Sequence, residues 1–313
     1  MTREQRFAWE ERAVRAASAL CSWLPRGLVL RLGRALGRLL ADLDRRHVEI
    51  TRDNLRHAFP EWDETRVRRT ARDVYAHFGL MLLDILWLSH RTQEQMMALV
   101  DFVNEPYLEA LRPAGGIFVT AHLGNWELCG VTHGYVFRPV GVVARPLDNE
   151  ALDRRLSSFR QRSGNWVIPK QKALAHVLRV LRDRREVAIL IDQNVQAKDG
   201  IFIQFFGRTA ASTTVAAALA VKTGCPVIGG RAVLLPNGRY RQMYDPPMYP
   251  PSSGDREADI AAMTQALADM IERWVRETPE QWLWMHRRWK TQPSSPEAEN
   301  ASGPLTVPAE PSV

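Results

Sequence analysis

The stretch IFVTAHLGNWELCG, residues 117–130, begins as an apolar, β-branched run and continues with polar residues. Its first residues suit a buried strand, whereas Gly124 and Asn125 favour a turn and the start of a helix. His122 is therefore expected at the carboxyl end of the strand, and Glu127 in the first turn of the helix. Ligands of open α/β sheets bind at that end of the strands. The stretch thus predicts a small polar pocket that contains His122 and Glu127.

Short β-branched runs alternate with helical stretches along the rest of the chain. This alternation predicts an α/β fold with a largely parallel central sheet flanked by helices. A chain of 313 residues that is 45% hydrophobic can bury a core of that size. The further strands are expected at 140–144, 166–169, 187–192 and 226–235, and helices at 173–186 and 213–224.

Residues 27–46, GLVLRLGRALGRLLADLDRR, have the pattern of a basic amphipathic helix. At about 100° per residue, arginines gather on one face and leucines on the other. Such helices often lie in a bilayer interface, although an ordinary surface helix with its leucines in the core has the same pattern. Arginines interrupt each apolar run before it reaches the roughly 18 residues that a membrane span requires. The basic face of the helix comprises Arg31, Arg34, Arg38 and Arg45, and the apolar face comprises Leu32, Leu36, Leu39 and Leu43.

The composition predicts three segments and a cytoplasmic location. We assign residues 1–46 to N-terminal amphipathic, membrane-associating helices, 47–292 to the α/β domain, and 293–313, rich in Pro, Ser, Ala and Glu, to a disordered tail. The first residues lack the order of a secretory signal. Three widely spaced cysteines form neither a disulfide framework nor a zinc motif.

The net charge of +7 and the pI of about 9.6 imply an acidic partner. Nucleic acid, an anionic bilayer and an acidic protein all fit the charge. The sequence contains no helix-turn-helix, zinc-finger or RNA-recognition motif, so we expect no nucleic-acid partner. The amphipathic N-terminal helix favours an anionic membrane surface.

Two further polar groups are expected near the pocket. Asp192 ends the apolar run VAILID as His122 ends IFVTA, although a strand-end aspartate is often only a cap. A basic stretch follows Arg145 and includes Arg160; most of its arginines suit a solvated helix face, but one aimed at a phosphate or an oxyanion would suit catalysis.

The ordered motifs HLGNWE, RPLDN, DQN, FFGRTAAST and PEQWLWMHRRWK, with the early NLRHAFPEW, resemble the late acyltransferases of lipid A biosynthesis. These are the lauroyl and myristoyl transferases of the lysophospholipid acyltransferase superfamily, and a phosphatidylinositol mannoside acyltransferase branch belongs with them. The resemblance extends from about His47 to Thr291. The amino terminus differs, because many members carry a convincing transmembrane helix there.

The resemblance implies transfer of a fatty acyl group from an acyl carrier protein or coenzyme A thioester to a hydroxyl of a membrane glycolipid. A lipid A precursor is the expected acceptor, with a phosphatidylinositol mannoside or another glycerophospholipid as the alternative. The reaction needs no cofactor and no metal. It implies a peripheral or monotopic enzyme on the cytoplasmic face of the inner membrane.

The resemblance also implies roles for individual residues. His122 would be the general base that takes the proton of the acceptor hydroxyl, and Glu127 would hold its tautomer. Arg160 occupies the position of a functionally important arginine and is an oxyanion candidate, in competition with backbone amides near Gly124. Asp192 occupies the position of an important acidic residue, either as an acceptor contact or as a support for the site. The substrate-binding candidates are Gly124, Asn125, Arg145, Gln193 and Arg208.

Several alternatives are open at this level. Cys129 should turn away from the pocket on its helix, so a covalent acyl-cysteine is not expected. A metal hydrolase would need His122, Glu127 and Asp192 to meet around an ion. A non-catalytic lipid-binding protein would need the groove alone. For an acidic carrier protein, the expected docking charges are the arginines Arg182, Arg184 and Arg185.

Overall fold

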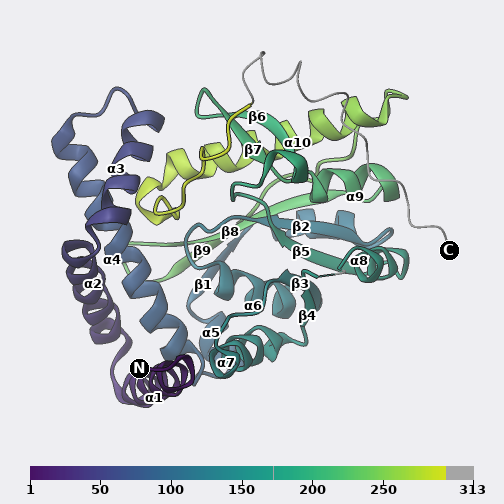
Figure 1. Ribbon diagram of the computed structural model, residues 1–313. Helices are drawn as coiled ribbons and strands as arrows, with labels where there is room; N and C mark the ends of the chain where they lie inside the picture. The colour runs from purple at the N-terminus through teal and green to yellow at the C-terminus, as the bar shows by residue number, and fades with distance from the viewer. Residues whose placement is uncertain (172, 294–313) are drawn as a thin grey trace.

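The computed structural model describes residues 1–171 and 173–293, and most of the predicted tail, 294–313, lies outside them. Figure 1 shows a central sheet with helices on both faces: α6 and α7 lie below it, and α9 and α10 lie above it. Helices α2 to α4 flank one end of the sheet. The predicted α/β class is confirmed.

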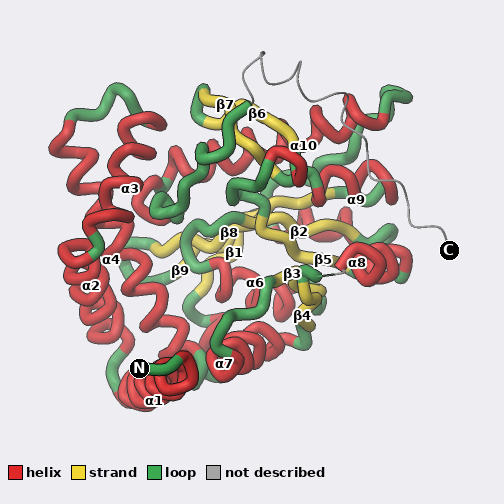
Figure 2. The backbone as a smooth tube through the Cα atoms, viewed as in Figure 1, coloured by secondary structure: helices red, strands yellow, loops and turns green. Residues whose placement is uncertain are grey.

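The strands of the main sheet have the order β1-β9-β8-β2-β5-β3-β4, as far as the described residues define it. Neighbouring strands are parallel throughout, except that β8 and β9 are antiparallel, so the expectation of a largely parallel sheet is also confirmed. Figure 2 shows the strands in yellow between the helices. A separate hairpin joins β6 and β7. The strands are β1 (Val100–Val103), β2 (Gly116–Thr120), β3 (Val140–Ala144), β4 (Trp166–Pro169), β5 (Glu186–Leu190), β6 (Ile201–Phe205), β7 (Arg208–Ser212), β8 (Val227–Leu234) and β9 (Tyr240–Tyr244).

Helices α2, α8 and α9 lie where helices were expected. A turn that contains Pro60 separates α3 from α4. The boundary that we placed after residue 46 falls inside α3. The helices are α1 (Arg3–Trp23), α2 (Arg26–Leu43), α3 (Arg45–Ala58), α4 (Glu64–Leu88), α5 (Gln93–Met97), α6 (Trp126–Val136), α7 (Glu150–Arg160), α8 (Ala173–Arg182), α9 (Val215–Thr223) and α10 (Arg256–Glu277).

Glycines set the packing of α2 against α4. A Cβ added at Gly37 would lie 2.0 Å from the carbonyl oxygen of Tyr75, and one added at Gly79 would lie 2.4 Å from that of Gly33. The backbones therefore meet directly, and the leucines of the predicted apolar face, Leu32, Leu36, Leu39 and Leu43, are exposed to solvent. Leu39 is 55% exposed and Leu43 is 71% exposed. The alternative in which these leucines fill the core is wrong.

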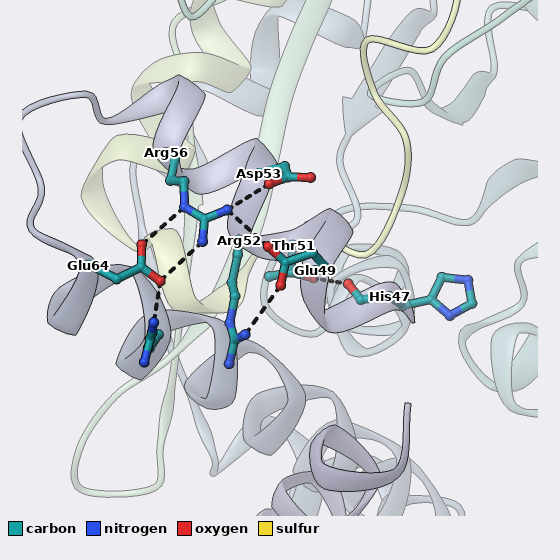
Figure 3. A network of polar contacts seen from close by, with 8 residues as sticks. His47, Glu49, Thr51, Arg52, Asp53, Arg56 and Glu64 are labelled. Atoms are coloured by element: carbon teal, nitrogen blue, oxygen red, sulfur yellow. Dashed lines mark hydrogen bonds and ion pairs between the residues drawn. The ribbon is translucent and has the colours of Figure 1, made fainter. Parts of the chain in front are cut away.

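A polar network fastens the turn between α3 and α4 (Figure 3). Arg56 donates to both carboxylate oxygens of Glu64, at 3.1 Å each, and to Asp53 and Glu49 on its own helix. These groups are exposed to solvent, so their attraction is screened and contributes little to stability. The network orients the turn rather than holding the core together.

In the described part of the chain, no helix is both long and apolar enough to cross a membrane.

Candidate active site

The sheet register brings His122 and Asp192 together. Strands β2 and β5 are parallel neighbours, and Thr120 at the end of one pairs with Leu190 at the end of the other. His122 and Asp192 each follow two residues later. Two separate strand ends in the sequence therefore contribute to one site at the carboxyl edge of the sheet.

Asp192 holds both the backbone and the ring of His122. The His122 amide donates to Oδ2 of Asp192 at 2.8 Å, and the ring Nδ1 lies 2.8 Å from Oδ1. The indole N–H of Trp282 also donates to Oδ2, at 2.8 Å. A carboxylate only accepts, so Nδ1 carries the proton and the other ring nitrogen, Nε2, is left as a proton acceptor.

Burial and the neighbouring charges have opposite effects on the pKa values of His122 and Asp192. Burial lowers the pKa of His122, but the charge and hydrogen bond of Asp192 and the charge of Glu127 outweigh it, so the pKa ends above 6.5. Burial raises the pKa of Asp192, but His122 and Trp282 bring it down to about 2. Asp192 is therefore ionised at neutral pH.

Glu127 lies in the first turn of α6, as predicted, but it does not contact the His122 ring as we expected. Its carboxylate accepts two hydrogen bonds from Arg160, from Nε at 2.7 Å and from Nη2 at 2.5 Å. The pair is largely buried, with side-chain exposures of 16% for Arg160 and 7% for Glu127. The contact that we assigned to Glu127 is made by Asp192, because β5, and not α6, lies beside the end of β2.

An apolar cavity of about 40 Å³ adjoins the Glu127–Arg160 pair. Strands β2, β3 and β5 and helix α6 supply its walls, including Phe118, Val142 and Leu190. This volume holds roughly three water-sized groups. The cavity is thus large enough for a short apolar group but not for a whole acyl chain.

The turn at Gly124 and Asn125 is fixed from several sides. Gly124 has φ +63°, and an added Cβ would lie 2.0 Å from the carbonyl oxygen of Ala232. Its amide donates to the carbonyl of Gln281 and the Asn125 amide donates to that of Ala232, at 2.9 Å each. The Asn125 side chain caps α6 by accepting from the amide of Leu128. Both amides are thus engaged within the protein, which leaves neither free for an oxyanion.

The remaining substrate-binding candidates are exposed. Arg145 follows β3 at the same edge of the sheet and lies 3.7 Å from Asp148. Gln193 follows Asp192 directly. Arg208 begins β7 on the hairpin, where burial, and then the charge of Arg208, lower the pKa of His57. The structure therefore groups His122, Asp192, Glu127 and Arg160 and leaves these three on the surface.

The C-terminal segment completes the site, which the sequence analysis did not predict. Gln281 and Leu283 bond to the backbone at Gly124 and His122, and Trp282 bonds to Asp192. Downstream, Nε2 of His286 accepts from the Asn194 amide. The density of aromatic and basic residues in PEQWLWMHRRWK was the only local signal.

Two alternatives lose support from this geometry. Cys129 is fully buried in α6, and burial raises the pKa of its thiol to about 12, so it is no ready nucleophile. Glu127 is bound to Arg160 instead of sharing a ligand site with His122 and Asp192. In the described residues, no group of three or more potential ligand side chains is placed to hold a metal ion.

Comparison with known proteins identifies this α/β protein as an acyltransferase. The chain belongs to the bacterial lipid A biosynthesis acyltransferase family, whose model matches residues 6–291. It is 26% identical over 274 residues to the lipid A biosynthesis lauroyltransferase of Escherichia coli K12, covering 86% of this chain and 88% of that protein. It is 24% identical over 276 residues to the palmitoleoyltransferase of the same organism, covering 86% and 87%. It is also 27% identical over 179 residues to the phosphatidylinositol mannoside acyltransferase of Mycolicibacterium smegmatis, covering 56% and 57%. The family resemblance that the motifs indicated is confirmed.

Proposed function

We propose that this enzyme transfers a fatty acyl group from a thioester to a hydroxyl of a lipid A precursor, with His122 as general base. The observation that carries the proposal is the His122–Asp192 pair, which fixes the proton on Nδ1 and leaves Nε2 as the acceptor. The apolar cavity beside Glu127 and Arg160 suits a short apolar part of a lipid substrate.

The proposed step is direct, without an acyl-enzyme. Nε2 of His122 takes the proton of the acceptor hydroxyl as its oxygen attacks the thioester carbonyl carbon. A tetrahedral intermediate forms and then collapses: the carbon–sulfur bond breaks, the new ester remains, and the proton passes from His122 to the leaving thiolate. Asp192 stabilises the imidazolium between the two transfers.

The relatives support the proposed acceptor class. The lauroyltransferase and palmitoleoyltransferase named above align over most of this chain, whereas the phosphatidylinositol mannoside enzyme aligns over 56% of it. We therefore place a lipid A precursor first and a phosphatidylinositol mannoside second. A site on the cytoplasmic face of the inner membrane is part of this proposal.

The proposed donor is an acyl carrier protein thioester, with acyl-coenzyme A as the alternative. The arginines first considered for docking, Arg184 among them, directly precede β5, whereas Asp192 follows its other end. A five-residue strand separates them by about 17 Å. Arg145 and Lys170, exposed after β3 and β4, lie at the edge of the sheet that carries the site and are better placed to steer an acidic carrier.

The purified enzyme, supplied with acyl carrier protein or coenzyme A thioesters of several chain lengths, is expected to acylate an under-acylated lipid A precursor in detergent micelles. Mass spectrometry of the lipid would give the added acyl mass, with phosphatidylinositol mannoside as the competing acceptor. In cells that lack the enzyme, total glycolipids should lose one acyl group from one lipid. Thioester hydrolysis without any acylated glycolipid would contradict the proposal.

We further propose that α2 lies on an anionic bilayer. Charge and exposure together support this proposal. The leucines of the predicted apolar face are exposed, and arginines including Arg31 and Arg38 are exposed along the same helix. Each arginine near an anionic surface contributes about 1 kcal/mol, and each fully inserted leucine about 1.5–3 kcal/mol. Trp23, 88% exposed just before α2, suits the same interface.

Replacing Leu39 and Leu43 together by serine is expected to weaken co-sedimentation with anionic vesicles by at least about tenfold, because their apolar surface no longer enters the bilayer. The matched control is Leu174→Ser on α8, which is 61% exposed. Removing residues before 47 is a poorer test, because it takes Arg26 from the buried carboxylate of Asp84, where the pair meets at 2.9 Å. Equal binding by wild type and the double variant would refute the proposal, and a dimer lost in that variant would assign the face to a second copy instead.

A further inference from the structure

His286 lies in the C-terminal segment that borders the candidate site, and its backbone is held on two sides. The amide of Leu283, three residues earlier, donates to the carbonyl oxygen of His122 at 3.0 Å. The side-chain amide of Asn54 donates to the carbonyl oxygen of His286 at 2.9 Å. The half-buried ring is thus attached to a segment whose backbone is held in place next to the site.

The ring contact determines the tautomer of His286. Nε2 accepts a hydrogen bond from the backbone amide of Asn194 at 2.7 Å. A ring nitrogen that accepts cannot carry a proton, so the neutral ring carries it on Nδ1. Asn194 is itself fixed by two hydrogen bonds with Thr291, at 2.9 and 3.2 Å. Among the described residues, no group accepts a hydrogen bond from Nδ1 of His286.

His122 and His286 therefore leave opposite groups without a protein partner among the described residues. His122 offers the unprotonated Nε2, whereas His286 offers a protonated Nδ1. Burial lowers the pKa of His286 to about 4; Asp192 opposes this shift, and Arg288 and His122 add to it. His286 is thus neutral at pH 7. One histidine with a raised pKa and a neighbouring one with a lowered pKa are the arrangement expected of a base and an uncharged hydrogen-bond donor.

The proposed reaction needs such a donor. Negative charge develops on the thioester carbonyl oxygen as the hydroxyl attacks. The amides of Gly124 and Asn125 already donate to Gln281 and Ala232. Arg160 has its Nε and one Nη2 proton engaged by Glu127, so only its remaining Nη protons are left for a substrate. The Nδ1–H of His286 has no such partner in the described chain.

We propose that His286 is a catalytic residue whose Nδ1–H donates a hydrogen bond to the thioester carbonyl oxygen as the tetrahedral intermediate forms. The inference rests on the acyl transfer proposed above and adds a residue to it. The carbonyl electron pair moves onto the oxygen and returns when the carbon–sulfur bond breaks. The proton stays on Nδ1 throughout, because His286 stabilises charge and transfers no proton.

Two amide substitutions separate this role from a structural one. His286→Gln places an amide oxygen near the position of Nε2, so it can keep the Asn194 contact while it removes the Nδ1 donor. His286→Asn places an amide N–H near the position of Nδ1 and loses the Asn194 contact. We expect kcat of His286→Gln, at saturating donor and acceptor, to fall by about 10²–10³-fold. His286→Asn should keep more activity despite a lower unfolding temperature.

The order of the two variants decides the inference. If His286 only holds Asn194, the asparagine variant will be the slower enzyme and the glutamine variant will resemble wild type, which would overturn the proposal. A rise in KM at unchanged kcat in the glutamine variant would also overturn it. If wild type transfers acyl groups and the glutamine variant does too, at equal rate, only this inference fails. If wild type transfers none, the proposed function fails, and this inference falls with it.

Discussion

His122→Ala is expected to lower kcat for acyl transfer by about 10²–10⁴-fold, the contribution that general acid–base catalysis typically supplies. The loss follows because Nε2 is the proton acceptor left when Asp192 occupies Nδ1. Fold should be retained, since the ring is about 20% exposed and its removal opens no large core cavity. Initial rates with thioester donor and lipid acceptor measure the effect, and circular dichroism checks the fold.

The matched control is His176→Ala, on the exposed surface of α8, which should leave the rate unchanged. Cys129→Ala should also be nearly silent, and no acyl-enzyme should accumulate when donor is supplied without acceptor. Transfer at the wild-type rate by a folded His122→Ala protein would remove His122 from the mechanism. A trapped acyl-cysteine would replace direct transfer by a covalent route.

Asp192→Asn is expected to lower kcat by up to about 10⁴-fold, because the amide no longer fixes the His122 tautomer or stabilises its charged form. The pH dependence of kcat/KM gives a second test, because the direction of its shift is predicted. His122 must be unprotonated to act, so kcat/KM should rise with pH through its pKa, which lies above 6.5 in the native enzyme. Removal of the Asp192 charge lowers that pKa, so the rising limb should move to lower pH while the plateau falls.

The control for this substitution is Asp259→Asn, another buried carboxylate, which lies on α10 and accepts from the Ser253 amide. It should alter stability without moving the pH profile. Glu127→Gln should slow turnover, because the ion pair with Arg160 is lost. It should also move the rising limb of the pH profile to lower pH, since the charge of Glu127 raises the pKa of His122. An unchanged limb in Asp192→Asn would show that another group sets the observed titration.

Local patterns were sufficient to locate the strand ends that carry the chemistry. The run before His122 forms β2, Asn125 caps α6, and the run before Asp192 forms β5, each as the residue types predicted. Strands β1, β6, β7 and β9 were not predicted. β9 alternates buried and exposed residues around polar side chains such as Arg241, so it gives no apolar run to detect.

The sequence by itself determined the fold class, the family and the presence of His122, Glu127, Arg160 and Asp192, because apolar periodicity, caps and ordered motifs are properties of neighbouring residues. Only the tertiary structure decided which of these side chains meet. Asp192 reaches His122 because β5 is the neighbour of β2 in register, whereas Glu127 is turned to Arg160. Leu39 and Leu43 of α2 are exposed because glycines bring the opposite side of that helix against α4, and His286 lies beside the site because the C-terminal segment bonds to the backbone at His122. Strand order, register and close backbone contact depend on residues far apart in the chain, so no local pattern contains them.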